Sequence, residues 1–72
     1  MSNKFLYITE EKDPKTGKPN GKWSVSPHDG PVEKYSNSYD DAKKYARNQG
    51  AKSVMVEILG PDGNYISHEE QL

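Results

Sequence analysis

Two histidines in this 72-residue chain stand directly beside carboxylates, and these residues come nearest to catalytic or metal-binding chemistry. His28 precedes Asp29, and a carboxylate that contacts an imidazole can fix its tautomer and raise its basicity. Adjacent side chains in a turn seldom point at each other, and the sequence offers no serine elbow motif and no cysteine for such a base to activate. We therefore expect His28 to cap a turn, and we predict no catalytic residue.

A metal site would have to bring together the residues of both histidine–carboxylate groups: His28, Asp29, His68, Glu69 and Glu70. Their spacing matches neither of the short histidine motifs that bind zinc on a helix. The chain also has no cysteine, which removes disulfides and the usual structural zinc sites. We expect no metal, no cofactor and no enzymatic activity.

Four lysines surround a glycine-containing segment that could hold phosphate groups: Lys12, Lys15, Lys18 and Lys22. The segment lacks the spacing of a Walker loop, and no helix is expected to begin after it to receive an anion. The chain has a single arginine, Arg47, although arginine dominates base readout and bidentate phosphate binding. We interpret the four lysines as a solvated hairpin loop. Nucleic-acid binding through them, together with exposed aromatic residues, is the alternative function.

The composition is that of one small domain spanning residues 1–72. Ten lysines and arginines nearly balance eleven acidic residues, so no overall field attracts nucleic acid or an anionic membrane. Hydrophobic residues make up only 31% of the chain, and the aromatic residues must supply much of the buried area, so we expect a thin, aromatic core. No apolar run is long enough for a signal peptide or a membrane span. We expect a cytoplasmic protein.

Alternation of apolar and polar residues predicts strands at residues 5–9, 23–26, 53–59 and 65–67, and a short further strand is allowed at residues 32–35. Trp23 and Val25 point to one face of their strand, which ends at Pro27. Turn residues predict a flexible loop at about residues 11–21, and a frayed tail is expected at about residues 68–72.

A single helix is predicted over residues 39–49. Ser38 has the residue type of an N-cap, and Gly50 supplies the expected stop. Two alanines on the predicted inner face, Ala42 and Ala46, suit close approach to a sheet. The elements predict an α+β fold in ββ(β)αββ order, with a small, mostly antiparallel sheet of four or five strands and one helix packed on one face.

Three segments of the chain together resemble a known family. They are W-S-V-S-P-H-D-G at residues 23–30, Y-D-D-A-K-K-Y-A-R-N-Q-G-A at residues 39–51 and V-M-V-E-I-L-G-P-D-G-N-Y-I at residues 54–66. They resemble a bacterial family of small domains of unknown function, number 2188. The chain departs from this family in an additional N-terminal strand, a shorter helix and the lack of a second aromatic residue after the Pro-His turn. The resemblance implies a fold and no catalytic chemistry.

The strand at residues 53–59 is apolar on both faces, which is more than one helix can cover. The face that the helix leaves open would carry Met55 and Leu59 or, alternatively, Val54, Val56 and Ile58, and we expect Met55 and Leu59 to face outward. Exposed apolar surface of this kind usually marks an interface. We therefore predict a non-enzymatic interaction or regulatory protein, of a bacterial or phage kind, that binds a protein partner or itself. The residues expected to make this contact are Met55, Leu59, Trp23 and Tyr65.

Overall fold

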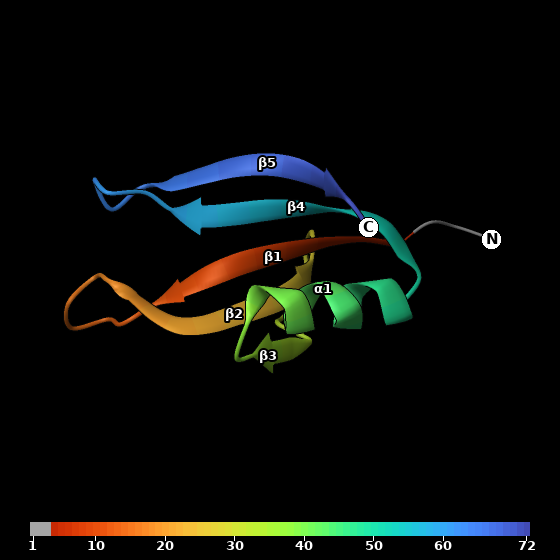
Figure 1. Ribbon diagram of the computed structural model, residues 1–72, viewed down its shortest axis with the longest axis horizontal. Coiled ribbons are helices and arrows are strands. Elements are labelled where there is room, and N and C mark those ends of the chain that lie inside the picture. Colours follow the sequence, from red (N-terminus) through yellow and green to blue (C-terminus); the bar gives the residue numbers. More distant parts are fainter. Residues whose placement is uncertain (1–3) are drawn as a thin grey trace.

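The computed structural model describes residues 4–72, with the side chain of Lys4 excepted. These residues form β1 (Lys4–Lys12), β2 (Pro19–Pro27), β3 (Lys34–Ser36), α1 (Tyr39–Asn48), β4 (Ala51–Leu59) and β5 (Tyr65–Gln71). The five strands make one sheet in the order β3-β2-β1-β4-β5, and α1 packs on one face of it (Figure 1). This is the α+β fold that the sequence predicts, with the optional short strand present as β3.

The centre of the sheet is its one parallel pair. β1 and β4 run side by side with Leu6 opposite Val54 and Ile8 opposite Val56, whereas every other neighbouring pair of strands is antiparallel. Parallel strands need a long crossover connection, and α1 lies within that connection.

Within residues 4–72, no helix is long and apolar enough to cross a membrane.

The buried core lies between α1 and the sheet, and it is aliphatic. The large side chains that are fully buried come from three adjacent strands: Leu6, Ile8, Val25, Val54 and Val56. Ala42 and Ala46 of α1 are fully buried against them, because a methyl side chain lets the helix backbone approach closely.

The expectation of an aromatic core was wrong. Trp23, Tyr39 and Tyr45 are only partly buried and surround the aliphatic core, and the rings of Trp23 and Tyr39 lie 5.1 Å apart. These side chains combine a large apolar area with a polar group, which suits the margin of a small core. The Tyr45 hydroxyl donates to Glu33 Oε1 at 3.4 Å in an exposed position, whereas the Tyr39 oxygen is buried.

The ends of the helix and the second hairpin follow the local sequence signals. The Ser38 hydroxyl accepts a hydrogen bond from the Asp41 backbone N–H at 3.1 Å, which confirms the predicted N-cap. Gly50 follows the helix with a φ of 94°, and Gly63 takes a φ of 87° in the turn between β4 and β5. Both glycines occupy the left-handed region that favours their residue type.

Two predicted irregular segments are largely extended. β1 continues to Lys12 and β2 begins at Pro19, so the connecting loop is only residues 13–18 rather than about 11–21. The tail predicted to fray at about residues 68–72 instead continues β5 to Gln71, and the Leu72 N–H donates to the Lys52 carbonyl at 2.9 Å. Backbone pairing with β4 orders these residues although their side chains carry no strand pattern.

Replacing Ala46 with leucine tests the close contact between helix and sheet. The added atoms have no space against the buried strands, so we expect the free energy of unfolding to fall by about 1–3 kcal/mol. Chemical denaturation measures this change. The control is Lys44→Leu at an exposed position of the same helix, where we expect a change within about 0.5 kcal/mol. Equal effects of the two substitutions would contradict the packing described.

Candidate functional site

The face of the sheet opposite α1 has no second layer within residues 4–72. Because side chains alternate along a strand, the residues between the buried positions point to this side. Its apolar and aromatic members come from three adjacent strands: Phe5 and Tyr7 of β1, Met55 and Leu59 of β4, and Tyr65 of β5. We call the surface that these five residues form the open face.

The members of the open face lie together because of strand register. Tyr7 is opposite Met55 across the parallel pair, and Leu59 is opposite Tyr65 across the second hairpin. The rings of Phe5 and Tyr7 meet edge to face with their centroids 5.6 Å apart. Phe5 and Tyr65 each keep 39% of their surface exposed, and none of the five belongs to the buried core.

The structure separates the four residues that were predicted to bind a protein. Met55, Leu59 and Tyr65 share the open face, as the alternation of their strands implies. Trp23 lies on the helix side, where it packs against Tyr39. Sequence reasoning missed Phe5 and Tyr7: the alternation in β1 was visible, but only the buried positions Leu6 and Ile8 establish which side faces the helix.

Polar groups around the open face bond to one another. The Thr9 hydroxyl donates to Glu57 Oε1 at 2.8 Å, and the Ser24 hydroxyl donates to Glu11 Oε2 at 2.8 Å. The Tyr65 hydroxyl donates to the Glu10 carbonyl at 2.9 Å. Burial, with the negative charges of Glu11, Glu10 and Glu57, raises the pKa of Tyr65. The hydroxyl of Tyr65 is therefore a hydrogen-bond donor and a poor proton-transfer group.

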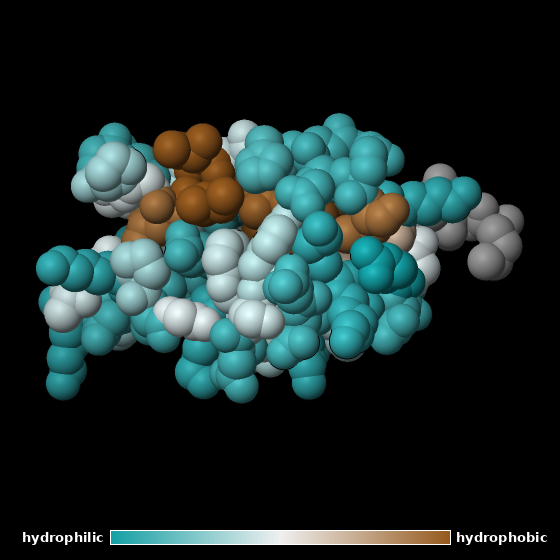
Figure 2. Space-filling model, in the orientation of Figure 1, coloured by the Kyte–Doolittle hydropathy of each residue, from teal (hydrophilic) through white to brown (hydrophobic). Residues whose placement is uncertain are grey.

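A second apolar patch lies on the helix side, beyond the end of α1. Ile58 and Ile66 are paired across β4 and β5 and keep 38% and 59% of their surfaces exposed. Figure 2 shows hydrophobic residues gathered over this part of the sheet, beside the helix. The prediction that Ile58 would be buried with Val54 and Val56 was wrong, because Ile58 lies beyond the reach of the helix.

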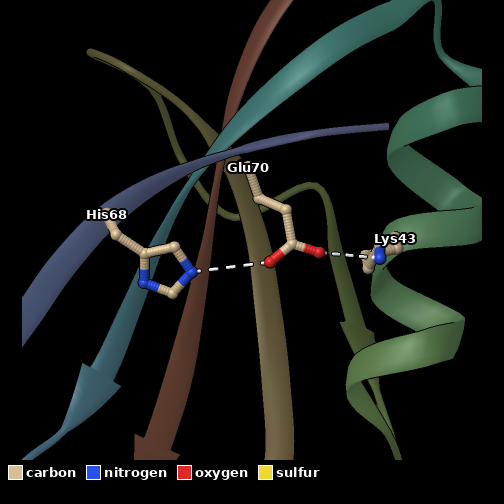
Figure 3. Close-up of polar contacts among 3 residues, drawn as sticks. All are labelled: Lys43, His68 and Glu70. Atoms are coloured by element: carbon tan, nitrogen blue, oxygen red, sulfur yellow. Dashed lines mark hydrogen bonds and ion pairs between the residues drawn. The ribbon is translucent and has the colours of Figure 1, made fainter.

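Lys43, Glu70 and His68 form a polar group between α1 and β5 (Figure 3). Lys43 Nζ lies 2.8 Å from Glu70 Oε2, and His68 Nε2 lies 3.5 Å from Glu70 Oε1. The hydrogen bond from Lys43, with smaller contributions from Tyr39 and His68, lowers the pKa of Glu70 to about 2. A carboxylate that stays ionised to such low pH is a poor proton donor near neutrality.

The Tyr39 hydroxyl lies close to this group. Its oxygen is buried and, among the described residues, has no hydrogen-bond partner of ordinary geometry. Burial and the neighbouring Glu70 carboxylate both raise the pKa of Tyr39. The ammonium of Lys43 lies 5.3 Å from the centre of the Tyr39 ring. The arrangement attaches the helix to β5.

The two histidine–carboxylate groups are far apart in the fold. His28 follows β2 and His68 belongs to β5, so β1 and β4 lie between them. His28 Nδ1 and the Tyr7 hydroxyl share a hydrogen bond at 3.0 Å, so His28 connects its turn to β1 rather than capping the turn. His28 Nε2 lies 3.8 Å from Asp29 Oδ1, so these adjacent side chains do approach each other, in an exposed position. Within residues 4–72, no group of three or more histidine, aspartate or glutamate side chains is placed to hold a metal ion.

The four lysines of the first hairpin do not converge. Lys12 Nζ lies 5.9 Å from the centre of the Tyr65 ring on β5. Lys22 Nζ lies 3.5 Å from Asn37 Oδ1, just after β3, toward the opposite edge of the sheet. Lys15 and Lys18 lie in the exposed loop, where their backbone N–H groups bond to loop side chains. This arrangement does not concentrate positive charge at one point.

Comparison with known proteins adds no assignment. The sequence matches no protein-family model, no curated protein and no solved structure. The resemblance to family number 2188 therefore stays a prediction.

The Lys43–Glu70 contact predicts a pH dependence of stability. The pKa of Glu70 is about 2 in the fold against an ordinary value of 4.5. The ion pair should therefore stabilise the fold fully above about pH 4.5, and this stabilisation should be lost as the pH falls towards 2. We expect Glu70→Gln to remove about 1 kcal/mol at pH 7 and clearly less at pH 2, where the Glu70 carboxyl is partly protonated. Denaturation across this pH range measures the difference, and exposed Glu69→Gln should not reproduce it.

The separation of the lysines predicts the absence of specific nucleic-acid binding at physiological salt. Titrations of single-stranded and duplex DNA and RNA, followed by fluorescence anisotropy, test this expectation. If the loop held phosphates, affinity would fall steeply with salt, and changing Lys15 and Lys18 to glutamine would reduce the salt slope by about one for each phosphate that these lysines neutralise. Submicromolar binding with that loop dependence would establish the alternative function.

Proposed function

We propose that this chain is a non-enzymatic protein-binding module whose contact surface is the open face. The observation that carries the proposal is the one-sided core. Every large side chain that is fully buried, such as Leu6 or Val56, lies on the helix side of the sheet. The apolar side chains of the open face are therefore not needed to close the core, and they remain available for a partner.

The residue types of the open face suit a protein contact. Tyrosine, phenylalanine and methionine are enriched at the centres of interfaces, and a few such anchors carry most of the binding energy. Tyr7 and Met55 lie beside each other at the middle of the sheet, on its two central strands. Contiguous apolar surface is rarely left exposed on a small domain without a binding role.

The polar groups support the non-enzymatic part of the proposal. The Glu70 carboxylate is engaged by Lys43 on one oxygen and approached by His68 on the other. Thr9 and Ser24 bond to carboxylates beside the open face. These groups connect strands and the helix to each other. A regulator or adaptor of a bacterial or phage kind fits this combination.

Charge substitutions on β4 test the proposal. Leu59→Glu and Met55→Lys place a charge on the open face, and Met55→Lys avoids a like-charge pair with Glu69 opposite it. We expect partner capture to be lost while the free energy of unfolding changes by less than about 1 kcal/mol. Capture from a lysate of the native host, read by mass spectrometry, identifies proteins that bind the native chain. Thermal melting by circular dichroism checks the fold.

The matched control is Ile58→Glu, which changes the neighbouring residue of the same strand on the helix side. Partners of the open face should still bind this variant. If Ile58→Glu removes the same partners and Leu59→Glu does not, the contact surface is the helix side instead. If Met55→Lys and Leu59→Glu both unfold the domain, the open face belongs to the core and the proposal fails.

A further inference from the structure

The outer edge of β5 is a regular strand edge that no strand covers within residues 4–72. β5 pairs with β4 in unbroken register from Tyr65 opposite Leu59 to Gln71 opposite Ser53. The hydrogen bonds that flank this ladder join Gly60 to Asn64 and Lys52 to Leu72. Because hydrogen-bonded pairs alternate along antiparallel strands, the even-numbered residues of β5 bond to β4. The N–H and C=O groups of the odd-numbered residues therefore point outward.

The two edges of the sheet differ in how they resist further pairing. Natural edge strands are protected by short length, charged side chains (especially lysine), proline or a bulge, because unpaired backbone groups are a template for another strand. β3 is three residues long and carries Lys34. β5 has seven residues and contains no lysine, proline, glycine or register shift, and its charged residues are Glu69 and Glu70. The longer and more regular edge is therefore β5.

We propose that two copies of this chain pair antiparallel through β5, with the two-fold axis at Ser67, to form one continuous sheet. In this register Glu69 lies opposite Tyr65 of the second copy, and Ile66 lies opposite His68 of the second copy. No like charges face each other. Moving the axis to Glu69 would place two carboxylates opposite each other, and like-charge pairs are unfavourable across strands. Moving the axis to His68 would place each Ile66 opposite a Glu70 carboxylate.

The same pairing covers part of the apolar patch on the helix side. With the axis at Ser67, the Ile66 side chains of the two copies become diagonal neighbours, about 7–8 Å apart. Ile66 is 59% exposed in the single chain, and its strand partner Ile58 lies directly behind it. Self-pairing therefore gives exposed aliphatic surface a place to pack, while the outward backbone groups of both copies become hydrogen-bonded.

The contact is modest in size. About five residues from each copy take part, which buries less than the roughly 1,200 Å² of a standard stable interface. We expect a monomer–dimer equilibrium with a dissociation constant on the order of micromolar rather than a permanent dimer. The inference does not depend on the proposed function, because it rests on the backbone groups at the edge of β5; Tyr65 is the one residue of the open face that also lies in this contact.

A charge exchange at the two-fold axis tests the pairing. In the proposed register Ser67 lies opposite Ser67 of the second copy. Ser67→Lys and Ser67→Glu should therefore each be monomeric, because each variant places two like charges opposite each other. A mixture of the two variants should recover the dimer as a heterodimer. Sedimentation velocity at micromolar to millimolar concentration measures these states, and circular dichroism confirms that each variant is folded.

Two further variants separate this inference from other surfaces. Tyr35→Lys changes the opposite edge of the sheet, and Leu59→Glu changes the open face, so both should dimerise like the native chain. A native chain that stays monomeric at millimolar concentration overturns the proposal, and so does a Ser67→Lys variant that dimerises normally. Dimerisation lost only in Leu59→Glu would overturn it as well, by moving the self-contact to the open face.

Discussion

The packing of two alanines against one face of the sheet is the constraint on which the rest of the structure depends. Ala42 and Ala46 bring a ten-residue helix against strands of up to nine residues. Such a helix is about 15 Å long, whereas such a strand extends for about 30 Å. One helix therefore covers only part of one face. The exposed pair of Ile58 and Ile66, and the whole open face, follow from this difference in length.

Electrostatics and hydrogen bonds extend the fold where apolar packing stops. Lys43 reaches from the helix to Glu70 on β5, across a part of the sheet that the helix does not cover. On the other side, Glu57 receives a hydrogen bond from Thr9 across the parallel pair. In a domain with so small a core, polar side chains at the margin hold the elements together.

Features that depend on neighbouring residues were predicted well from the sequence. Features that depend on contacts between distant segments were not predicted. Ser38 as the N-cap and Gly63 in the turn are decided by neighbouring residues, so the sequence is sufficient for them. The extension of β5 depends on its ladder with β4, which the pattern of its own side chains does not indicate. The candidate surface was predicted in part. Met55 and Leu59 were assigned to the side that the helix leaves open, where the structure places them. Trp23 was expected in the same contact but lies on the helix side, because only the position of the helix decides which face is covered.

The parallel pairing of β1 with β4 has a consequence for how the chain acquires its structure. Thr9 and Glu57, which bond across this pair, are 48 residues apart. During synthesis the first hairpin can form early, but the central strand of the sheet lacks one neighbour until β4 has been made. Closing so long a loop costs entropy before any contact offsets it, and such topologies fold slowly. The domain should therefore fold as one late, cooperative unit, and truncation before β4 should leave β1 without one of its two neighbouring strands.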